Sequence, residues 1–447
     1  MLKRSFGSHS MLGGLIQGRL PGQLVIQMTD RCNARCPQCG MRVTEDFPRS
    51  TLAVDLVKRI LDAAAERGFR AVSFTGGEPF LFLEQLAELI THARSVGIEY
   101  IRTGTNGFLF ANPDSPHFDS RVKRAVETLA ATPLRNLWIS IDSAVPAVHE
   151  EMRGLPGVIK GIERALPVFH DHGIYPAANL GLNRNIGGGA AGNALAETQE
   201  YPLSIYDEFR RGLRKFYGFV IDLGFTMVNT CYPMSTEPEA EGASPDAVYA
   251  ATSTDRVVRF TETERVLLFK ALFDTIPEYR SEVRVFSPRT SLYALMGQYS
   301  TSAHKAYPCR GGIDFFFVDA RDGNTYPCGY RGQENLGRLW DLDLDSVDTA
   351  EVCKRCDWEC FRDPSELAGP ALQAWGNPLA LLAKLYKDRT YARLWWEDLK
   401  YYRACGLFDG REAPDLQRLG KFEAKLPARA TVGGQLLENL DGLGVDW

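Results

Sequence analysis

The residues best suited to chemistry in this chain are its cysteines, most of which fall into two groups. The chain has 447 residues and ten cysteines, and the first group is Cys32, Cys36 and Cys39 in the spacing CxxxCxxC. Cysteine thiolates are the usual ligands of iron–sulfur clusters. Three thiolates bind three irons of a four-iron cluster and leave the fourth iron open to a small molecule. A structural zinc site takes four protein ligands, and no fourth Cys or His stands near this group in the sequence.

The second group contains five cysteines, and we place it in a module at residues 305–365: Cys309, Cys328, Cys353, Cys356 and Cys360. Alternating and aromatic runs on either side of Asp322-Gly323 predict a small hairpin that presents Cys309 and Cys328 on one side. A CxxC pair with two distant cysteines suits zinc as well as iron. The residues alone therefore leave a zinc ribbon and an iron–sulfur site open.

Strands and helices alternate over the part of the chain that carries the first group. Apolar runs rich in β-branched residues predict six buried parallel strands at 24–29, 71–75, 100–104, 137–142, 175–182 and 225–232. Amphipathic segments at 56–67, 83–96, 157–172 and 207–223 predict helices between them. Right-handed crossovers would curl these units into a partial, TIM-like (βα)6 barrel, an α/β fold. The first cysteine group then follows the first strand at the mouth of the barrel, where such folds place their chemistry.

The predicted barrel occupies 22–235, after an N-terminal extension at 1–21. A linker and a bridging helix follow at 236–304, then the cysteine-rich module at 305–365 and a helical C-terminal extension at 366–447. A hydrophobic fraction of 45% is typical of globular proteins, and the net charge of −5 argues against binding nucleic acid. The sequence has no secretory signal and no apolar run near the ~20 residues that span a bilayer. We therefore expect a cytoplasmic protein without structural disulfides.

The first group resembles the CxxxCxxC motif of the radical S-adenosylmethionine (SAM) superfamily, and the ends of later strands resemble further motifs of that family. Gly76, Gly77, Glu78 and Pro79 match its GGEP motif, whose backbone and carboxylate hold the methionine amino group of SAM. Thr105 and Asn106 match its TNG turn, and the resemblance implies SAM contacts for Ser140 and Arg153 and a ribose contact for Asn183. Gln38 departs from the pattern, because the family usually has an aromatic or large apolar residue there.

This resemblance implies an enzyme in which a [4Fe–4S] cluster binds SAM and cleaves it reductively to a 5′-deoxyadenosyl radical. The radical then abstracts hydrogen from a substrate C–H bond, and a reductant such as flavodoxin or ferredoxin supplies the electron. The expected outcome is an oxidative or rearranging modification in a biosynthetic pathway, of oxidoreductase or lyase type. The alternatives are a maturase that modifies peptide or protein side chains, a non-catalytic iron–sulfur electron carrier and a zinc protein.

The second group resembles the SPASM/Twitch auxiliary-cluster domain, in which a Gly precedes a cysteine as Gly323 precedes Cys328 here. The full SPASM pattern has more cysteines and two auxiliary clusters, so the resemblance implies one auxiliary [4Fe–4S] cluster. Its implied ligands are Cys309, Cys328, Cys353 and Cys356. Cys360 is an alternative to one of them, and Cys405 is a further candidate.

Four other features of the sequence carry expectations. The glycine-rich stretch 185–193 predicts a loop, either a substrate lid or a plain flexible insertion. About 22 residues precede the first strand, which favours a small-molecule substrate over one recognised by an N-terminal leader-binding domain. The amphipathic stretch 379–396 is expected to pack over the auxiliary module rather than to lie on a membrane surface. Cys231 is expected to be a small buried apolar residue.

Overall fold

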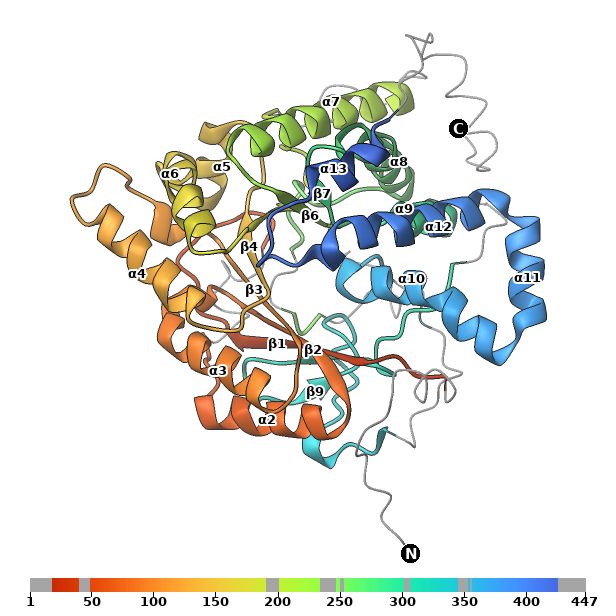
Figure 1. The fold of residues 1–447 in the computed structure, drawn as a ribbon, viewed down its shortest axis with the longest axis horizontal. Coiled ribbons are helices and arrows are strands. Elements are labelled where there is room, and N and C mark those ends of the chain that lie inside the picture. Colours follow the sequence, from red (N-terminus) through yellow and green to blue (C-terminus); the bar gives the residue numbers. More distant parts are fainter. Residues whose placement is uncertain are drawn as a thin grey trace, which may run out of the picture.

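The computed structural model describes residues 18–39, 49–189, 201–233, 247–249, 253–300, 306–344, 353 and 356–424. Its strands form one open sheet in the order β7-β6-β5-β4-β3-β2-β1-β8-β9. Every pair is parallel except β8 with β9, which confirms the expected α/β fold of a partial barrel (Figure 1). The strands are β1 (Gly22–Thr29), β2 (Phe69–Gly76), β3 (Tyr100–Thr105), β4 (Asn136–Ser140), β5 (Ala177–Gly181), β6 (Met227–Cys231), β7 (Arg284–Val285), β8 (Phe315–Val318) and β9 (Thr325–Tyr326).

The first six strands confirm the predicted ones to within a few residues. All eight residues of β1 are buried, as expected for a central strand covered on both faces. The helices between the strands are α2 (Val54–Glu66), α3 (Leu83–Ser95), α4 (Phe118–Ala130), α5 (Pro146–Arg153), α6 (Val158–Asp171) and α7 (Tyr201–Asp222). Sequence reasoning did not single out α4, although Phe118, Val122 and Val126 form one buried stripe at helical spacing. Short 3₁₀ turns are η2 (Pro79–Phe82), η3 (Phe108–Phe110), η4 (Leu339–Asp341), η6 (Gly406–Phe408) and η7 (Gly420–Phe422).

Segments that follow the barrel in the sequence extend its sheet on both sides. After α8 (Glu262–Tyr279), which starts with a capping box between Thr261 and Glu264, strand β7 pairs with β6. On the other side β8 pairs in parallel with β1, with Phe317 opposite Val25. The predicted hairpin is confirmed, because β8 continues into antiparallel β9. The cysteine-rich module is therefore joined to the barrel by backbone hydrogen bonds beside the strand that leads to the first cysteine group.

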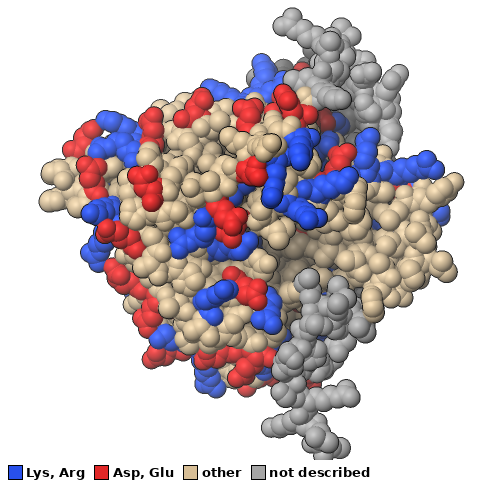
Figure 2. Space-filling model, viewed as in Figure 1, with Lys and Arg blue, Asp and Glu red and all other residues tan. Residues whose placement is uncertain are grey.

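The C-terminal helices are α9 (Arg289–Gln298), α10 (Glu359–Gly376), α11 (Pro378–Lys387), α12 (Arg389–Ala404) and α13 (Leu416–Leu419). Helix α12 buries Tyr391, Leu394 and Tyr401, and the Tyr391 ring lies 6.3 Å from that of Tyr307 in the cysteine-rich module. Helix α11 has no buried residue and leaves Leu379 exposed by 77%, although its Lys384 ammonium lies 3.5 Å from the centre of the Tyr307 ring. Helix α11 projects from the body in Figure 1, and a broad uncharged surface covers this side of the molecule in Figure 2. Among the described residues no helix is long and apolar enough to cross a membrane.

Candidate active site

The first cysteine group lies in the loop after β1, against the carboxyl ends of the neighbouring strands. Cys36 is buried, and Cys32 and Cys39 are partly buried. Burial raises the pKa of Cys36 to about 11, and burial likewise raises the pKa of Cys32. Buried thiolates need compensating positive charge nearby, which the irons of a cluster supply. The donor set therefore fits the iron–sulfur cluster expected from the sequence.

Two glycines allow the backbone at the end of β2 to contact this loop directly. The Gly77 N–H donates to the Thr29 carbonyl at 2.7 Å, and the Glu78 N–H donates to the Arg31 carbonyl at 2.8 Å. A Cβ on Gly77 would lie 2.1 Å from the Arg31 carbonyl oxygen, and one on Gly76 would lie 2.4 Å from that of Thr29. Only glycine permits this approach of the two backbones, which explains both glycines of the GGEP match.

The Glu78 side chain ties the ends of β2 and β3 together. Its Oε1 accepts hydrogen bonds from the Phe80 N–H at 3.0 Å and the Thr105 hydroxyl at 2.8 Å, and its Oε2 accepts one from the Asn106 N–H at 2.6 Å. Pro79 follows at the start of η2. Burial raises the pKa of Glu78 to about 7, against these donors. These bonds give Glu78 a positioning role at the two strand ends, and its expected contact with SAM stays a prediction.

Asn106 connects the end of β3 to the cysteine loop. Its Nδ2 donates to Asn33 Oδ1 at 2.9 Å and approaches the Cys32 sulfur at 3.7 Å, within reach of a weak hydrogen bond. Its Oδ1 accepts from the Phe108 N–H at 2.8 Å, which fixes the amide orientation. The TNG match thus holds the first cysteine in place from a neighbouring strand end.

A buried ion pair lies beyond the end of β4, next to the cysteine loop. Arg153 Nε donates to Asp142 Oδ2 at 2.7 Å, and Gln38 Nε2 donates to the same oxygen at 2.7 Å. Burial opposes the charge of Arg153, but Asp142, followed by Cys36, raises the pKa of the guanidinium above its usual value. Sequence reasoning did not assign a role to Asp142. The hydrogen bond from Gln38 to Asp142 explains why position 38, where the family usually has an aromatic or large apolar residue, is polar here.

Ser140 and Asn183 differ in how they meet the site. Ser140 is partly buried at the end of β4, opposite Asn179 of β5. Asn183 is fully buried, and its Nδ2 donates to the carbonyls of Asp142 at 2.8 Å and Gly181 at 2.7 Å. Its Oδ1 accepts from the Asn185 N–H at 2.7 Å. With its amide engaged by backbone, Asn183 braces the ends of β4 and β5.

His149, which sequence reasoning left without a role, lies behind the ion pair. Its Nδ1 accepts a hydrogen bond from the Asp142 N–H at 3.0 Å. Burial lowers its pKa to about 4, so the imidazole is neutral at physiological pH. The neutral ring fixes the backbone at Asp142, which in turn orients the carboxylate toward Arg153.

Four cysteines of the second group surround a common cavity. Cys309, Cys328, Cys353 and Cys356 line one small space together with Trp358 and Phe361. Within the described residues no three His, Cys, Asp or Glu side chains lie close enough together to hold a single metal ion. The four cysteines that the sequence analysis grouped together therefore meet at one place in the fold.

The two other candidates for this site lie elsewhere. Cys360 does not line the cavity, and its thiol approaches Glu359 Oε1 at 3.5 Å instead. Cys405 follows α12 and is buried, with Tyr401 among its neighbours. The arrangement thus separates the four expected auxiliary ligands from both alternatives.

Tyr249, from the predicted linker, spans the gap between the two cysteine groups. Its hydroxyl lies 3.1 Å from the Thr75 hydroxyl, which precedes the GGEP match. Its ring lies 5.6 Å from that of Trp358, which lines the auxiliary cavity. Burial raises the pKa of Tyr249, and nearby Cys360, Cys231 and Cys39 raise it further. Nothing in the local sequence pattern marked this tyrosine.

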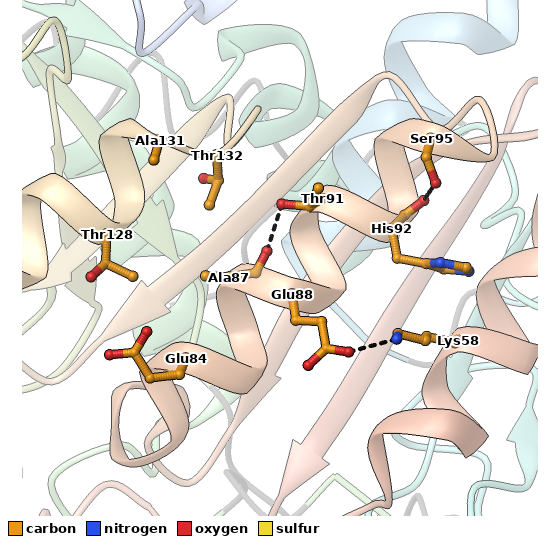
Figure 3. Close-up of a pocket in the computed structure, with 10 residues that line it drawn as sticks. All are labelled: Lys58, Glu84, Ala87, Glu88, Thr91, His92, Ser95, Thr128, Ala131 and Thr132. Carbon is orange, nitrogen blue, oxygen red and sulfur yellow. Dashed lines mark hydrogen bonds and ion pairs between the residues drawn. The ribbon is translucent and has the colours of Figure 1, made fainter.

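Two other hollows lie away from the cysteines. One of about 610 Å³ lies over α3 and between its neighbours, where Lys58 pairs with Glu88 at 2.5 Å (Figure 3). The residues that line it belong to α2, α3 and α4 or directly follow α4, and Lys58 and Glu88 point toward each other. The other, of about 390 Å³, borders the glycine-rich loop at Gly187 and Gly189. Residues 190–193 of the predicted lid lie outside the described residues.

Comparisons with known proteins match the region that builds this site. Residues 26–184 match the model of the Radical SAM superfamily. The AdoMet-dependent heme synthase of Methanosarcina barkeri is 23% identical over 362 residues, which cover 78% of this chain and 87% of that protein. The GTP 3′,8-cyclase of Tolumonas auensis is 32% identical over 148 residues, covering 32% of this chain and 40% of the cyclase. The match to the cyclase thus covers less than half of either protein.

Solved structures give weaker similarities over a comparable share of the chain. Streptococcus suis SuiB bound to S-adenosylmethionine aligns with a TM-score of 0.45 and 16% identity, covering 78% of this chain and 67% of that one. Native anSMEcpe with bound AdoMet and a Cp18Cys peptide aligns with a TM-score of 0.46 and 17% identity, covering 81% and 98%.

Proposed function

Because residues 26–184 match the model of the Radical SAM superfamily, we propose that this chain cleaves SAM reductively and abstracts hydrogen from a substrate C–H bond. The family uses a [4Fe–4S] cluster and SAM. In the proposal Cys32, Cys36 and Cys39 hold that cluster, and flavodoxin or ferredoxin supplies the electron. The bound cluster and SAM supply the radical, while the protein orients the substrate and shields the radical from side reactions.

One observation carries the proposal: separate strand ends converge on the cysteine loop. The backbone of Gly77 and Glu78 is bonded to the residues just before Cys32, and the amide of Asn106 approaches the Cys32 sulfur. On the far side, the Arg35 N–H donates to the Arg153 carbonyl at 3.1 Å. An electron carrier needs only the thiolates, whereas this shell also offers backbone and charged groups for a bound cofactor.

Individual residues of the shell have distinct proposed roles. Gly76, Gly77 and Pro79 shape the backbone that faces the methionine end of SAM, with Glu78 holding that backbone in place. Arg153 faces the SAM carboxylate with a charge that Asp142 keeps fixed, and Ser140 offers a hydroxyl from the neighbouring strand. Asn183 acts through the backbone of Asp142 rather than on the ribose.

The second cysteine group is proposed to hold one auxiliary [4Fe–4S] cluster on Cys309, Cys328, Cys353 and Cys356. Its cavity is lined by aromatic rings, and Tyr249 links it to the SAM site, so the two clusters would serve one substrate chamber. An auxiliary cluster that accepts an electron makes the net reaction an oxidation. The substrate is proposed to be a small molecule or peptide in a biosynthetic pathway.

The proposal is tested by product analysis of the anaerobically reconstituted chain. With dithionite and SAM, we expect 5′-deoxyadenosine and methionine to accumulate, measured by liquid chromatography and mass spectrometry. A brown, reducible protein that releases no nucleoside would instead identify an electron carrier. A colourless protein that keeps zinc after reconstitution would rule out both readings.

The auxiliary ligand set gives a separate prediction. Replacing Cys353 and Cys356 together by alanine should remove about four irons per chain while 5′-deoxyadenosine release continues, because the SAM site is left intact. Iron analysis and EPR measure the first effect, and product analysis measures the second. Cys360→Ala is the matched control and should keep its iron, because Cys360 lies outside the cavity. Loss of auxiliary iron from the Cys360 variant would contradict the assignment.

A further inference from the structure

A polar cluster lies between the barrel and the cysteine-rich module, apart from both cluster sites. We call it the Arg102 cluster; it comprises Arg102 of β3 and the groups whose charges act on it, which are Cys231 of β6 and Glu359 and Cys360 at the start of α10. The Cys360 thiol approaches Glu359 Oε1 at 3.5 Å, and Cys231 approaches Asn179 Oδ1 at 3.4 Å. Cys231 is therefore part of a polar group, although its sequence context predicted a small apolar core residue.

Arg102 is the unusual member of this cluster. Its Nε and Nη2 atoms are buried, and neither finds a hydrogen-bond partner. Its guanidinium lies 5.2 Å from the centre of the Trp138 ring, which holds the plane of the group. Buried guanidinium donors without partners cost free energy, so the folded chain keeps this arrangement at the expense of stability.

The acidic neighbour does not satisfy Arg102. Among the described residues Arg102 Nε and Nη2 have no hydrogen-bond partner, and both Glu359 oxygens face other groups. Glu359 Oε2 accepts from the Tyr232 N–H at 3.4 Å, and Oε1 faces the Cys360 thiol. By contrast, buried Arg284 donates to the Asp409 carbonyl at 2.8 Å and to the Thr226 hydroxyl at 3.0 Å. Arg284 is a structural arginine, whereas Arg102 has a donor edge left over.

We propose that the Nε–Nη2 edge of Arg102 binds a carboxylate of the substrate. These two N–H groups point the same way and form the parallel fork that receives both oxygens of a planar oxyanion. The negative charge of nearby Glu359 disfavours a doubly charged phosphate more than a singly charged carboxylate. The inference rests on the proposed function, because it assigns Arg102 to binding the substrate of that reaction. The bound substrate would lie next to Cys231 and Cys360.

The test uses the full reconstituted chain with SAM and without reductant, and it measures melting temperature. Sodium acetate is the carboxylate probe, sodium phosphate is the second arm, and sodium chloride at equal ionic strength is the reference. We expect acetate to raise the melting temperature of the unaltered chain by about 2 °C or more. Arg102→Lys keeps the charge without the fork and should lose this shift, as should Arg102→Met.

The same variants separate a binding role from a structural one. In chloride alone, Arg102→Met should melt at or above the temperature of the unaltered chain, because it removes unpaired buried donors. Arg284→Met is the matched control and should melt lower, because its hydrogen bonds are lost. A lowered melting temperature for Arg102→Met, or a larger shift with phosphate than with acetate, would overturn the inference. Failure to release 5′-deoxyadenosine alongside a normal acetate shift would count against the proposed function alone.

Discussion

Replacing Cys32, Cys36 and Cys39 together by alanine is expected to abolish 5′-deoxyadenosine release and to remove about four irons per chain. The thiolates are the only side chains proposed to hold the SAM-binding cluster, and without it no electron reaches SAM. Product analysis measures the nucleoside, and iron analysis with EPR of the reduced protein measures the cluster. The effect is complete rather than partial, because the remaining site supplies binding groups and no redox chemistry.

The matched control for this experiment is Cys405→Ala. Cys405 is also a buried free cysteine, but it lies at the end of α12, away from both proposed clusters. This variant should keep its iron and its nucleoside release, which separates loss of a ligand from loss of any buried thiol. Continued release of 5′-deoxyadenosine by the triple variant would remove the basis of the proposed function.

Arg153→Met is expected to destabilise the protein by about 3–5 kcal/mol, because it leaves Asp142 buried without its cation. The Asp142 side chain is 2% exposed and the Arg153 side chain 9%, so solvent screens this pair little. The variant should also bind SAM at least about tenfold more weakly, since the proposed partner of the SAM carboxylate is missing. Chemical denaturation measures the stability change, and equilibrium dialysis of SAM measures the affinity.

Two further variants make this result specific. Adding Asp142→Asn to Arg153→Met should recover part of the stability without recovering SAM affinity, because it removes the stranded charge but supplies no cation. Lys160→Met breaks the exposed pair with Asp114 at 2.8 Å and should leave both quantities unchanged. SAM affinity equal to that of the unaltered chain in the Arg153 variant would place Arg153 outside the cofactor site.

Local sequence patterns were sufficient to locate the proposed SAM site. Strand periodicity placed the ends of β1 to β4, and residues with chemical roles follow those ends directly. Parallel strands bring their carboxyl ends to one edge, so spacing along the chain translates into proximity in space. The glycines at 76 and 77 were expected from their type, and the contacts with Thr29 and Arg31 give the steric reason.

Those local patterns could not predict contacts between segments that are distant in the sequence. The pairing of β8 with β1 places the cysteine-rich module beside the first strand, and in that module Cys356 lines the cavity whereas Cys360 does not. Cys356 lies in the segment before α10 and Cys360 lies in its first turn, so only the tertiary structure tells the two cysteines apart.

The chain therefore carried its reaction class in short motifs, because cysteine spacing and glycine at strand ends act over a few residues. The unpaired edge of Arg102 and its neighbours on β6 and α10 came from folding, because they join segments more than a hundred residues apart. The proposed substrate contact depends on such long-range neighbours, and the proposed cofactor site depends mainly on local ones.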